Sequence, residues 1–252
     1  MNKMTETGRT LHGESSQMGG KPGVNDLAVI ESILRNRHHF FIEIRDGVEL
    51  GERMRAMLIS SFLFLALYGA VLGSTHSLWQ TLSSAFKLPL LFLATLIVCS
   101  PTLYFFNVLF GSNQSLTQNV ALILTAITVT AVLLLSFAPI VVFFLLTTAG
   151  YQFFKLMNVT IFAICGIVGV VFLAQGMRIV SGGGKEGARA RRWVMWLWVI
   201  VYAFVGSQMA WTLRPFIGAP SMQFELFRQL GGNFYTNIFA SIGEILGFVV
   251  VR

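Results

Sequence analysis

The sequence predicts an all-α integral membrane protein, a bundle of five to six transmembrane helices with an N-terminal amphipathic arm. The stretch between Glu52 and Glu186 contains neither aspartate nor glutamate. Of the 252 residues, 55% are hydrophobic, and they gather in runs long enough to cross a bilayer, which takes about 20 residues at a rise of about 1.5 Å. The net charge of +7 comes from basic residues that flank these runs, whereas nucleic-acid binders cluster such residues on a soluble face.

The apolar runs make residues 54–252 a predicted helical bundle. Its predicted spans cover residues 54–74, 88–110, 120–146, 158–180, 193–211 and 234–251. Pro101 predicts a kink in the second span, where neighbouring side chains would cover the freed carbonyl, and Pro139 predicts a break at the outer end of the third. The last run contains polar residues, so a re-entrant segment is the alternative to a sixth span there.

Two segments precede the bundle. Residues 1–24 are rich in glycine, serine and threonine and are predicted to form a disordered cytoplasmic tail. Residues 25–53 are predicted to form an amphipathic cytoplasmic or interfacial helix, with Phe40, Phe41 and Ile44 on its apolar face. That face could lie in the membrane interface, bind a protein partner or pack against the bundle.

Basic residues are distributed unevenly between the two sides of the predicted topology. The N-terminal flank and the loop after the fourth span carry Arg35, Arg37, Arg45, Arg53, Arg55, Arg178, Lys185, Arg189, Arg191 and Arg192. The loops of the opposite side contribute Lys87, Lys155, Arg214 and Arg228. Because loops rich in lysine and arginine stay in the cytoplasm, the N-terminus is predicted to be cytoplasmic.

Small residues form a stripe on each of two spans. Ala66, Gly69 and Gly73 share a face of the first span, and Gly166 and Gly169 share a face of the fourth. Small residues let two backbones approach closely in lipid, so both stripes are predicted to pack against other helices. The neighbour is either a helix of the same bundle or a helix of another subunit.

Hydroxyl side chains follow one face of the third span. Thr125, Thr128 and Ser136 fall nearly in line at helical spacing. Such a stripe can line a polar path across the membrane. Alternatively, each hydroxyl donates to a neighbouring helix or to the carbonyl four residues earlier in its own helix.

Glu244 is the one acid that the predicted topology places near the bilayer midplane. Ala240 and Gly243 lie on nearly the same helical face, so the carboxyl is predicted to point into the bundle. Ionisable groups at that depth are costly and are candidates for function. The carboxyl is either an ion-coupling group or a neutral group that hydrogen-bonds to a neighbouring hydroxyl or amide.

The chain carries no motif of a known catalytic or metal-binding chemistry. It contains neither an HExxH nor a paired-aspartate motif, and His38 and His39 are adjacent outside the predicted spans. Cys99 and Cys165 both lie inside predicted spans and form no CxxC pair. We therefore predict that the protein is not an enzyme and has no cofactor or metal site.

The run from Gln208 to Pro220, QMAWTLRPFIGAP, resembles a segment of a widespread bacterial family of multi-pass membrane proteins of uncharacterised activity. Three shorter pieces are similar to the same family, namely LYGA at 67–70, KLPLLFL at 87–93 and GNFY at 232–235. In the number and spacing of its spans, the chain is also distantly similar to Yip-type membrane proteins. The resemblance implies a bacterial cytoplasmic (inner) membrane protein and marks Gln208, Trp211 and Arg214 as candidate functional residues.

Two function classes follow from these patterns. A non-enzymatic membrane scaffold or anchor, or a subunit of a membrane assembly, fits the amphipathic arm, the small-residue stripes and the scarcity of intramembrane charge. Its partners would be the lipid bilayer and other proteins or further copies of the chain, and not nucleic acid. The alternative is a small channel or carrier with Glu244 as its ion-coupling residue, which the hydroxyl stripe and the proline-broken helices favour.

Overall fold

The computed structural model describes residues 26–74, 77–109, 114–147, 150–181, 188–217 and 232–246. Within these ranges the chain is helical and contains no strand, as the sequence predicts. The helices are α1 (Asp26–Arg35), α2 (Arg37–Asp46), α3 (Leu50–Gly73), α4 (Leu78–Leu109), α5 (Leu116–Thr147), α6 (Tyr151–Val180), α7 (Ala188–Thr212) and α8 (Phe234–Ile245). Five of them, α3 to α7, are long and apolar enough to cross a membrane, so the all-α multi-pass fold is confirmed. The predicted tail, residues 1–24, lies outside the described residues.

Proline interrupts neither of the two longest helices. Pro89 and Pro101 lie inside α4, and Pro139 lies inside α5, which continues to Thr147. The prediction that Pro139 breaks the outer end of this span is therefore wrong. In a membrane, a proline-containing helix continues because the remaining backbone groups have no water to bond with and are best satisfied within the helix.

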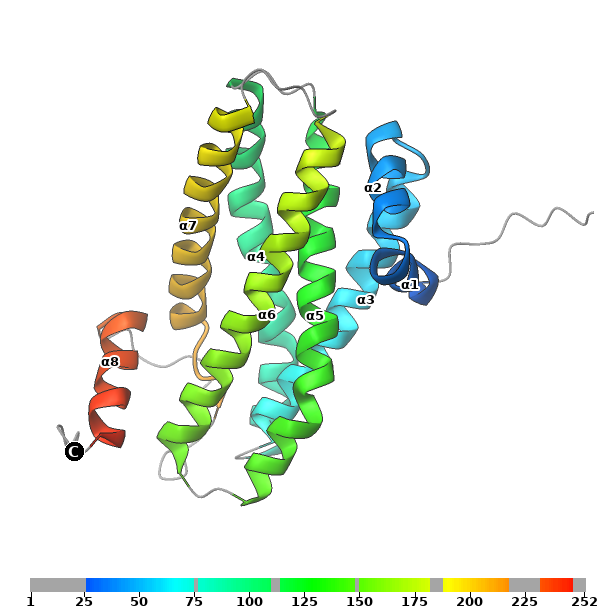
Figure 1. Ribbon diagram of the computed structural model, residues 1–252. Helices are drawn as coiled ribbons and strands as arrows, with labels where there is room; N and C mark the ends of the chain where they lie inside the picture. The colour runs from blue at the N-terminus through cyan, green and yellow to red at the C-terminus, as the bar shows by residue number, and fades with distance from the viewer. Residues whose placement is uncertain are drawn as a thin grey trace, which may run out of the picture.

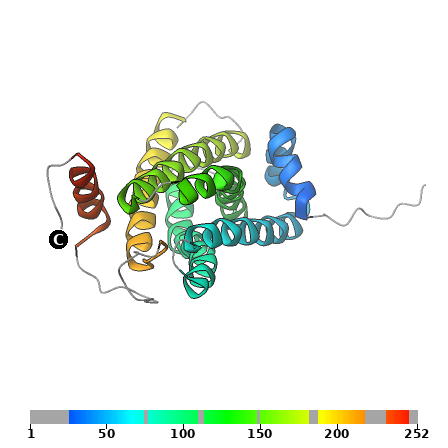
Figure 2. The same cartoon turned by 90° about the horizontal axis from the view of Figure 1, so that it is seen from below.

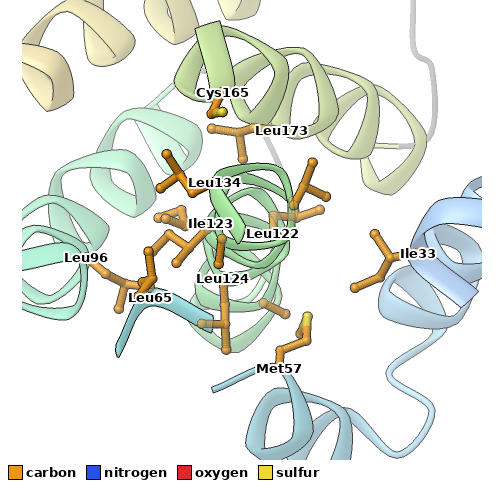
Figure 3. Close-up of a cluster of buried hydrophobic side chains, with 14 of the residues drawn as sticks. Ile33, Met57, Leu65, Leu96, Leu122, Ile123, Leu124, Leu134, Cys165 and Leu173 are labelled. Atoms are coloured by element: carbon orange, nitrogen blue, oxygen red, sulfur yellow. The ribbon is translucent and has the colours of Figure 1, made fainter. Parts of the chain in front are cut away.

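The long helices form an antiparallel bundle around α5 (Figure 1). Helix α5 packs against α3 and α6, α3 packs against α4, and α7 packs mainly against α4. Figure 3 shows Leu122, Ile123 and Leu124 of α5 at the centre of the buried apolar cluster. Side chains of the surrounding helices, among them Leu65, Leu96, Cys165 and Leu173, point toward this centre. The core is apolar because α5 presents large aliphatic side chains in several directions.

The predicted amphipathic segment, residues 25–53, is divided between elements instead of forming one helix. Helix α1 ends at Arg35 and α2 begins at Arg37, so the chain changes direction at Asn36. Helix α2 is closed by Gly47, whose φ of 75° is easily adopted only by a residue without a side chain. Helix α3 then starts at Leu50, so the first long helix includes the last charged turn of the predicted arm. We call α1 and α2 together the arm.

The arm and α8 lie on opposite edges of the molecule (Figure 2). The arm lies beside the half of the bundle where α3 begins, and α8 lies beside the opposite end, near the start of α6 (Figure 1). We call these the arm end and the connector end, the second after the connector, residues 213–217, which follows α7. The 12 residues of α8 extend over about 18 Å, which is shorter than the roughly 30 Å of a bilayer core. The remainder of the predicted sixth span, residues 247–251, lies outside the described residues.

Candidate functional site

The apolar face of the arm is covered by the protein's own bundle. Phe40, Phe41 and Ile44 are fully buried. A side chain added at Gly176 of α6 would meet the ring of Phe41 at 2.6 Å, so this glycine leaves the space that the ring occupies. Of the three predicted alternatives for this face, its burial fits packing against the bundle, because helices of the same chain already cover these three residues. The sequence pattern reveals an apolar face but not what covers it.

Polar contacts fix the arm in addition to its apolar face. The side-chain amide of Gln118 in α5 donates to the Arg45 carbonyl at 2.8 Å, close to the end of α2. Arg53 pairs with Glu43 at 2.8 Å, and both side chains are largely buried. The Arg53 guanidinium also lies 5.8 Å from the centre of the Phe40 ring, within the range of a cation–π contact. The arm is thus attached to α3, α5 and α6 by contacts of several kinds.

The other face of the arm is exposed and charged. Its exposed basic residues are Arg35, Arg37, His38, His39 and Arg45. Arg35 pairs with Glu31 at 3.1 Å, and Arg45 pairs with Asp46 at 2.9 Å. Exposed pairs of this kind contribute little to stability, about 0–1 kcal/mol. The residues of this face are therefore not required for the fold, and we call them the charged face of the arm.

The small-residue stripe of α3 packs against a helix of the same bundle. A side chain at Gly73 would meet the Thr81 Cα at 2.6 Å, and one at Gly69 would collide with the backbone of Ser84, so α3 and α4 touch backbone to backbone. Ala66, two turns before Gly73, is partly buried on the same helix. The stripe serves the internal contact, which was one of the two predicted alternatives.

The small residues of α6 have two different surroundings. Gly169 faces α5, and an added side chain there would collide with the Thr130 hydroxyl and approach the Ala126 carbonyl at 3.0 Å. Gly166 is partly exposed, and an added Cβ would meet no atom within 4 Å. Gly169 therefore permits close helix packing, whereas Gly166 borders open space.

The hydroxyl stripe of α5 donates inward to its own helix. Thr125 donates to the Ala121 carbonyl at 2.7 Å, Thr128 to the Leu124 carbonyl at 2.8 Å, and Ser136 to the Val132 carbonyl at 2.9 Å. Thr128 also forms a hydrogen bond of 2.9 Å with Ser61 of α3. These contacts fit the packing alternative, because each hydroxyl already has a protein acceptor.

A connector follows α7 and is held by two polar side chains of α4. The Gln80 amide donates to the Pro215 carbonyl at 2.9 Å, and the Ser84 hydroxyl donates to the Phe216 carbonyl at 2.6 Å. Lys87, one turn further along α4, is also buried. These three residues were not predicted as a group from the sequence. Their spacing of four and three places Gln80, Ser84 and Lys87 on one face, and this polar stripe in an apolar helix was the available signal.

The candidate residues Trp211 and Arg214 lie together at the connector. The Arg214 guanidinium stacks 3.5 Å from the centre of the Trp211 ring, and the indole N–H donates to the Gly232 carbonyl at 3.1 Å. Gln208, one turn before Trp211, accepts from the Thr212 hydroxyl through its backbone carbonyl at 2.9 Å. Trp211 thus joins the end of α7 to the start of α8. The remainder of the run, residues 218–220, lies outside the described residues.

Glu244 does not point into the bundle at midplane depth. Its carboxylate accepts a hydrogen bond of 2.7 Å from Gln152, the second residue of α6, and so lies at the connector end. Lys155, which donates to Asn237 at 3.0 Å, interacts electrostatically with Glu244. The midplane prediction is therefore wrong. It assumed that the run from residue 234 crosses the membrane directly, whereas α8 lies beside the first turns of α6.

Among the described residues, no group of three or more histidine, cysteine, aspartate or glutamate side chains could hold a metal ion. Cys99 and Cys165 are buried and free. No protein-family model, curated protein or solved structure matches the chain. The resemblance of the 208–220 run to a bacterial membrane family stays a prediction. The described side chains form two features. At the arm end, the arm is docked with its charged face exposed, and at the connector end, polar side chains of α4 hold the connector.

Proposed function

We propose that the protein is a multi-pass membrane scaffold or anchor whose arm presents its charged face to a protein partner. The observation that carries this proposal is the combination of a buried apolar face and an exposed charged face on the same short helices. Phe40, Phe41 and Ile44 are fully buried against the bundle. Arg37 and Arg45 are exposed, and Arg45 pairs with Asp46 at the surface. A partner that binds the charged face meets a preorganised surface, which lowers the entropy cost of binding.

The charge distribution supports a cytoplasmic location for this face. The described basic residues at the arm end are Arg35, Arg37, Arg45, Arg53, Arg55, Arg178, Arg189 and Arg192, whereas the connector end has Lys87, Lys155 and Arg214. Since cytoplasmic ends of membrane helices carry the excess of lysine and arginine, the arm end would face the cytoplasm. The partner is then a cytoplasmic protein, or the cytoplasmic part of another membrane protein, with a charged surface that complements the mixed charges of the arm.

Affinity purification from native membranes tests the proposal. The wild-type protein is expected to co-purify with a partner at a constant ratio, and Arg37→Ser combined with Arg45→Ser is expected to reduce that ratio several-fold. The matched control is Arg189→Ser combined with Arg192→Ser, which removes the same charge from exposed positions at the same end. This control is expected to retain the partner.

Two outcomes would contradict the scaffold. In one, no protein accompanies the wild type at a constant ratio. In the other, both double variants lose the partner equally, which would show that the net charge of the arm end, and not the arm itself, determines partner binding. Ion carriage through Glu244 is the competing function, and its supporting observation is the hydrogen bond of that carboxylate with Gln152, within the electrostatic influence of Lys155.

A further inference from the structure

A cavity of about 110 Å³ lies among four of the long helices. Its wall includes Phe92 of α4, Thr130 of α5, Gly166 of α6, and Trp198 and Tyr202 of α7. The charged face of the arm and the connector contribute none of the lining residues, so the cavity is separate from the features described above. Most of the wall is formed by aromatic rings and aliphatic side chains.

The cavity lies at the depth of the lipid hydrocarbon. Phe92, Thr130 and Gly166 are each near the middle of a helix of 30 or 32 residues. Such a helix extends over about 45–48 Å, longer than the roughly 30 Å hydrocarbon core. The middle of a helix that crosses the core therefore lies inside it, even if the helix is shifted along the membrane normal.

Two polar groups of the wall donate to backbone carbonyls of the protein. The indole N–H of Trp198 donates to the Cys99 carbonyl at 3.0 Å, so this buried ring is fixed to α4. The Thr130 hydroxyl donates to the Ala126 carbonyl at 2.9 Å. The Trp198 and Tyr202 rings lie 5.1 Å apart and line the α7 side of the cavity. Since most of the lining is apolar, the cavity favours hydrocarbon over a ligand that needs several hydrogen bonds.

The exposure of two lining residues indicates an opening of the cavity between α6 and α7. Helix α6 packs against α5 and helix α7 packs against α4, so the two helices form opposite walls. Gly166 of α6 and Val199 of α7 line the cavity and are both partly exposed. A Cβ at Gly166 would meet no atom within 4 Å. At this depth in a membrane, the molecules next to the opening are lipid chains.

We propose that this cavity binds a segment of a membrane lipid's acyl chain, which enters between α6 and α7 and lies against Gly166 and Trp198. An apolar protein cavity of about 150 Å³ holds one benzene molecule, so this space accommodates a piece of a chain and not a whole lipid. Filling it restores the dispersion contacts that the lining atoms would otherwise lack. The site goes beyond the proposed scaffold function and does not depend on it.

Tryptophan quenching by brominated lipid tests this binding. In the full-length protein, Trp79, Trp193, Trp196 and Trp211 are replaced by phenylalanine, which leaves Trp198 as the only reporter. The protein is reconstituted in phosphatidylcholine vesicles brominated near the chain ends. Although Trp198 is only 1% exposed, its fluorescence is expected to fall by about half, because the chain reaches it through the cavity.

Gly166→Phe fills the cavity and is expected to abolish most of this quenching, with Gly166→Leu giving a partial loss. The control Ala163→Phe adds the same ring to an exposed position of α6 and is expected to leave the quenching unchanged. A protein that retains only Trp196, which is 54% exposed, should be quenched in every background and so reports that the helix is folded and inserted.

Two results would overturn the proposal. If Trp198 is not quenched while Trp196 is, the cavity is empty or holds a protein side chain. If Trp198 is quenched equally with and without Gly166→Phe, the bromine reaches it from outside the cavity.

Discussion

The two sides of the bundle are held together in different ways. On the side of α3, half of the most apolar stretch is buried within the protein, whereas for α7 the share is 6%. The α3 side combines close backbone contact at Gly69 and Gly73 with the buried rings of the arm. Among its described residues, the α7 side has one fully buried ring, Trp198, and otherwise relies on separate polar contacts, such as that of the Trp198 indole with the Cys99 carbonyl and that of Ser207 with Tyr235 at 3.0 Å.

This difference shows which parts of the protein can move without unfolding it. In lipid, a single hydrogen bond between helices contributes about 0.6–2 kcal/mol, whereas a buried aromatic side chain contributes more. The fully buried large side chains of the arm include Phe40, Phe41 and Ile44, whereas the described side chains of α7 include one, Trp198. We therefore expect α7 and α8 to separate from α4 and α6 at a smaller cost than the arm leaves the bundle. The cavity lies at the boundary between the two regions, where such a movement would admit a lipid chain.

The largest expected effect is on the tightly packed side, at Phe41. Phe41→Ala removes a fully buried ring and should reduce the free energy of unfolding by about 3–5 kcal/mol. Leu34→Ala is the control, because Leu34 is in the same arm but is 49% exposed and should change stability by less than about 0.5 kcal/mol. Thermal unfolding in detergent measures both variants. Equal losses in the two would mean that the arm is not docked as described.

A smaller effect is expected at the contact between α3 and α4. Gly73→Val places a side chain 2.6 Å from the Thr81 Cα, and the forced separation of the helices should cost about 1–3 kcal/mol. The control is Gly166→Val, which adds the same side chain to α6 where no atom lies within 4 Å of the new Cβ. The same unfolding measurement should show little loss in the control. A harmless Gly73→Val would contradict the backbone contact.

The smallest effect is expected on the side of α7 and α8, at Glu244. Glu244→Gln keeps an oxygen that accepts from Gln152, so stability should change by less than about 0.5 kcal/mol. Glu244→Lys instead places an ammonium group beside Lys155 and should weaken the contact between α8 and α6.

The same variant separates the two functions. If the protein is a scaffold, Glu244→Gln should assemble normally. Ion flux, measured in reconstituted vesicles at two pH values, should show no pH-dependent component for the wild type or for Glu244→Gln. Flux through the wild type that disappears in Glu244→Gln would favour the carrier instead, because a glutamine does not titrate.

Hydropathy was sufficient to predict the membrane class, because a long apolar run without carboxylates has few alternatives to a transmembrane helix. It also located the cores of the long helices, although α4 begins at Leu78, well before the predicted start at residue 88. Amphipathic initial turns such as those around Gln80 and Ser84 lower the local hydropathy, so a pattern based on apolar residues starts the helix too late.

The contacts between distant residues could not be predicted from the sequence. Gln80 and Pro215 are separated by 135 positions, and no local pattern in either segment indicates the other. The predicted depth of Glu244 was wrong for a related reason. Composition indicates how polar a helix is, but it does not indicate the direction in which that helix runs relative to the bundle. The apolar face of the arm was visible in the sequence, whereas its partner, the space at Gly176, depends on how α6 is placed.

The contact between Phe41 and Gly176 has a consequence for the synthesis of the chain. A ribosome that adds about 5–20 residues per second needs roughly 7–27 s for the about 135 residues between them. During this interval Phe40 and Phe41 have been made, but the helix that covers Phe41 has not. The arm can complete its docking only after α6 is in place, so the last step of its folding waits for the second half of the protein.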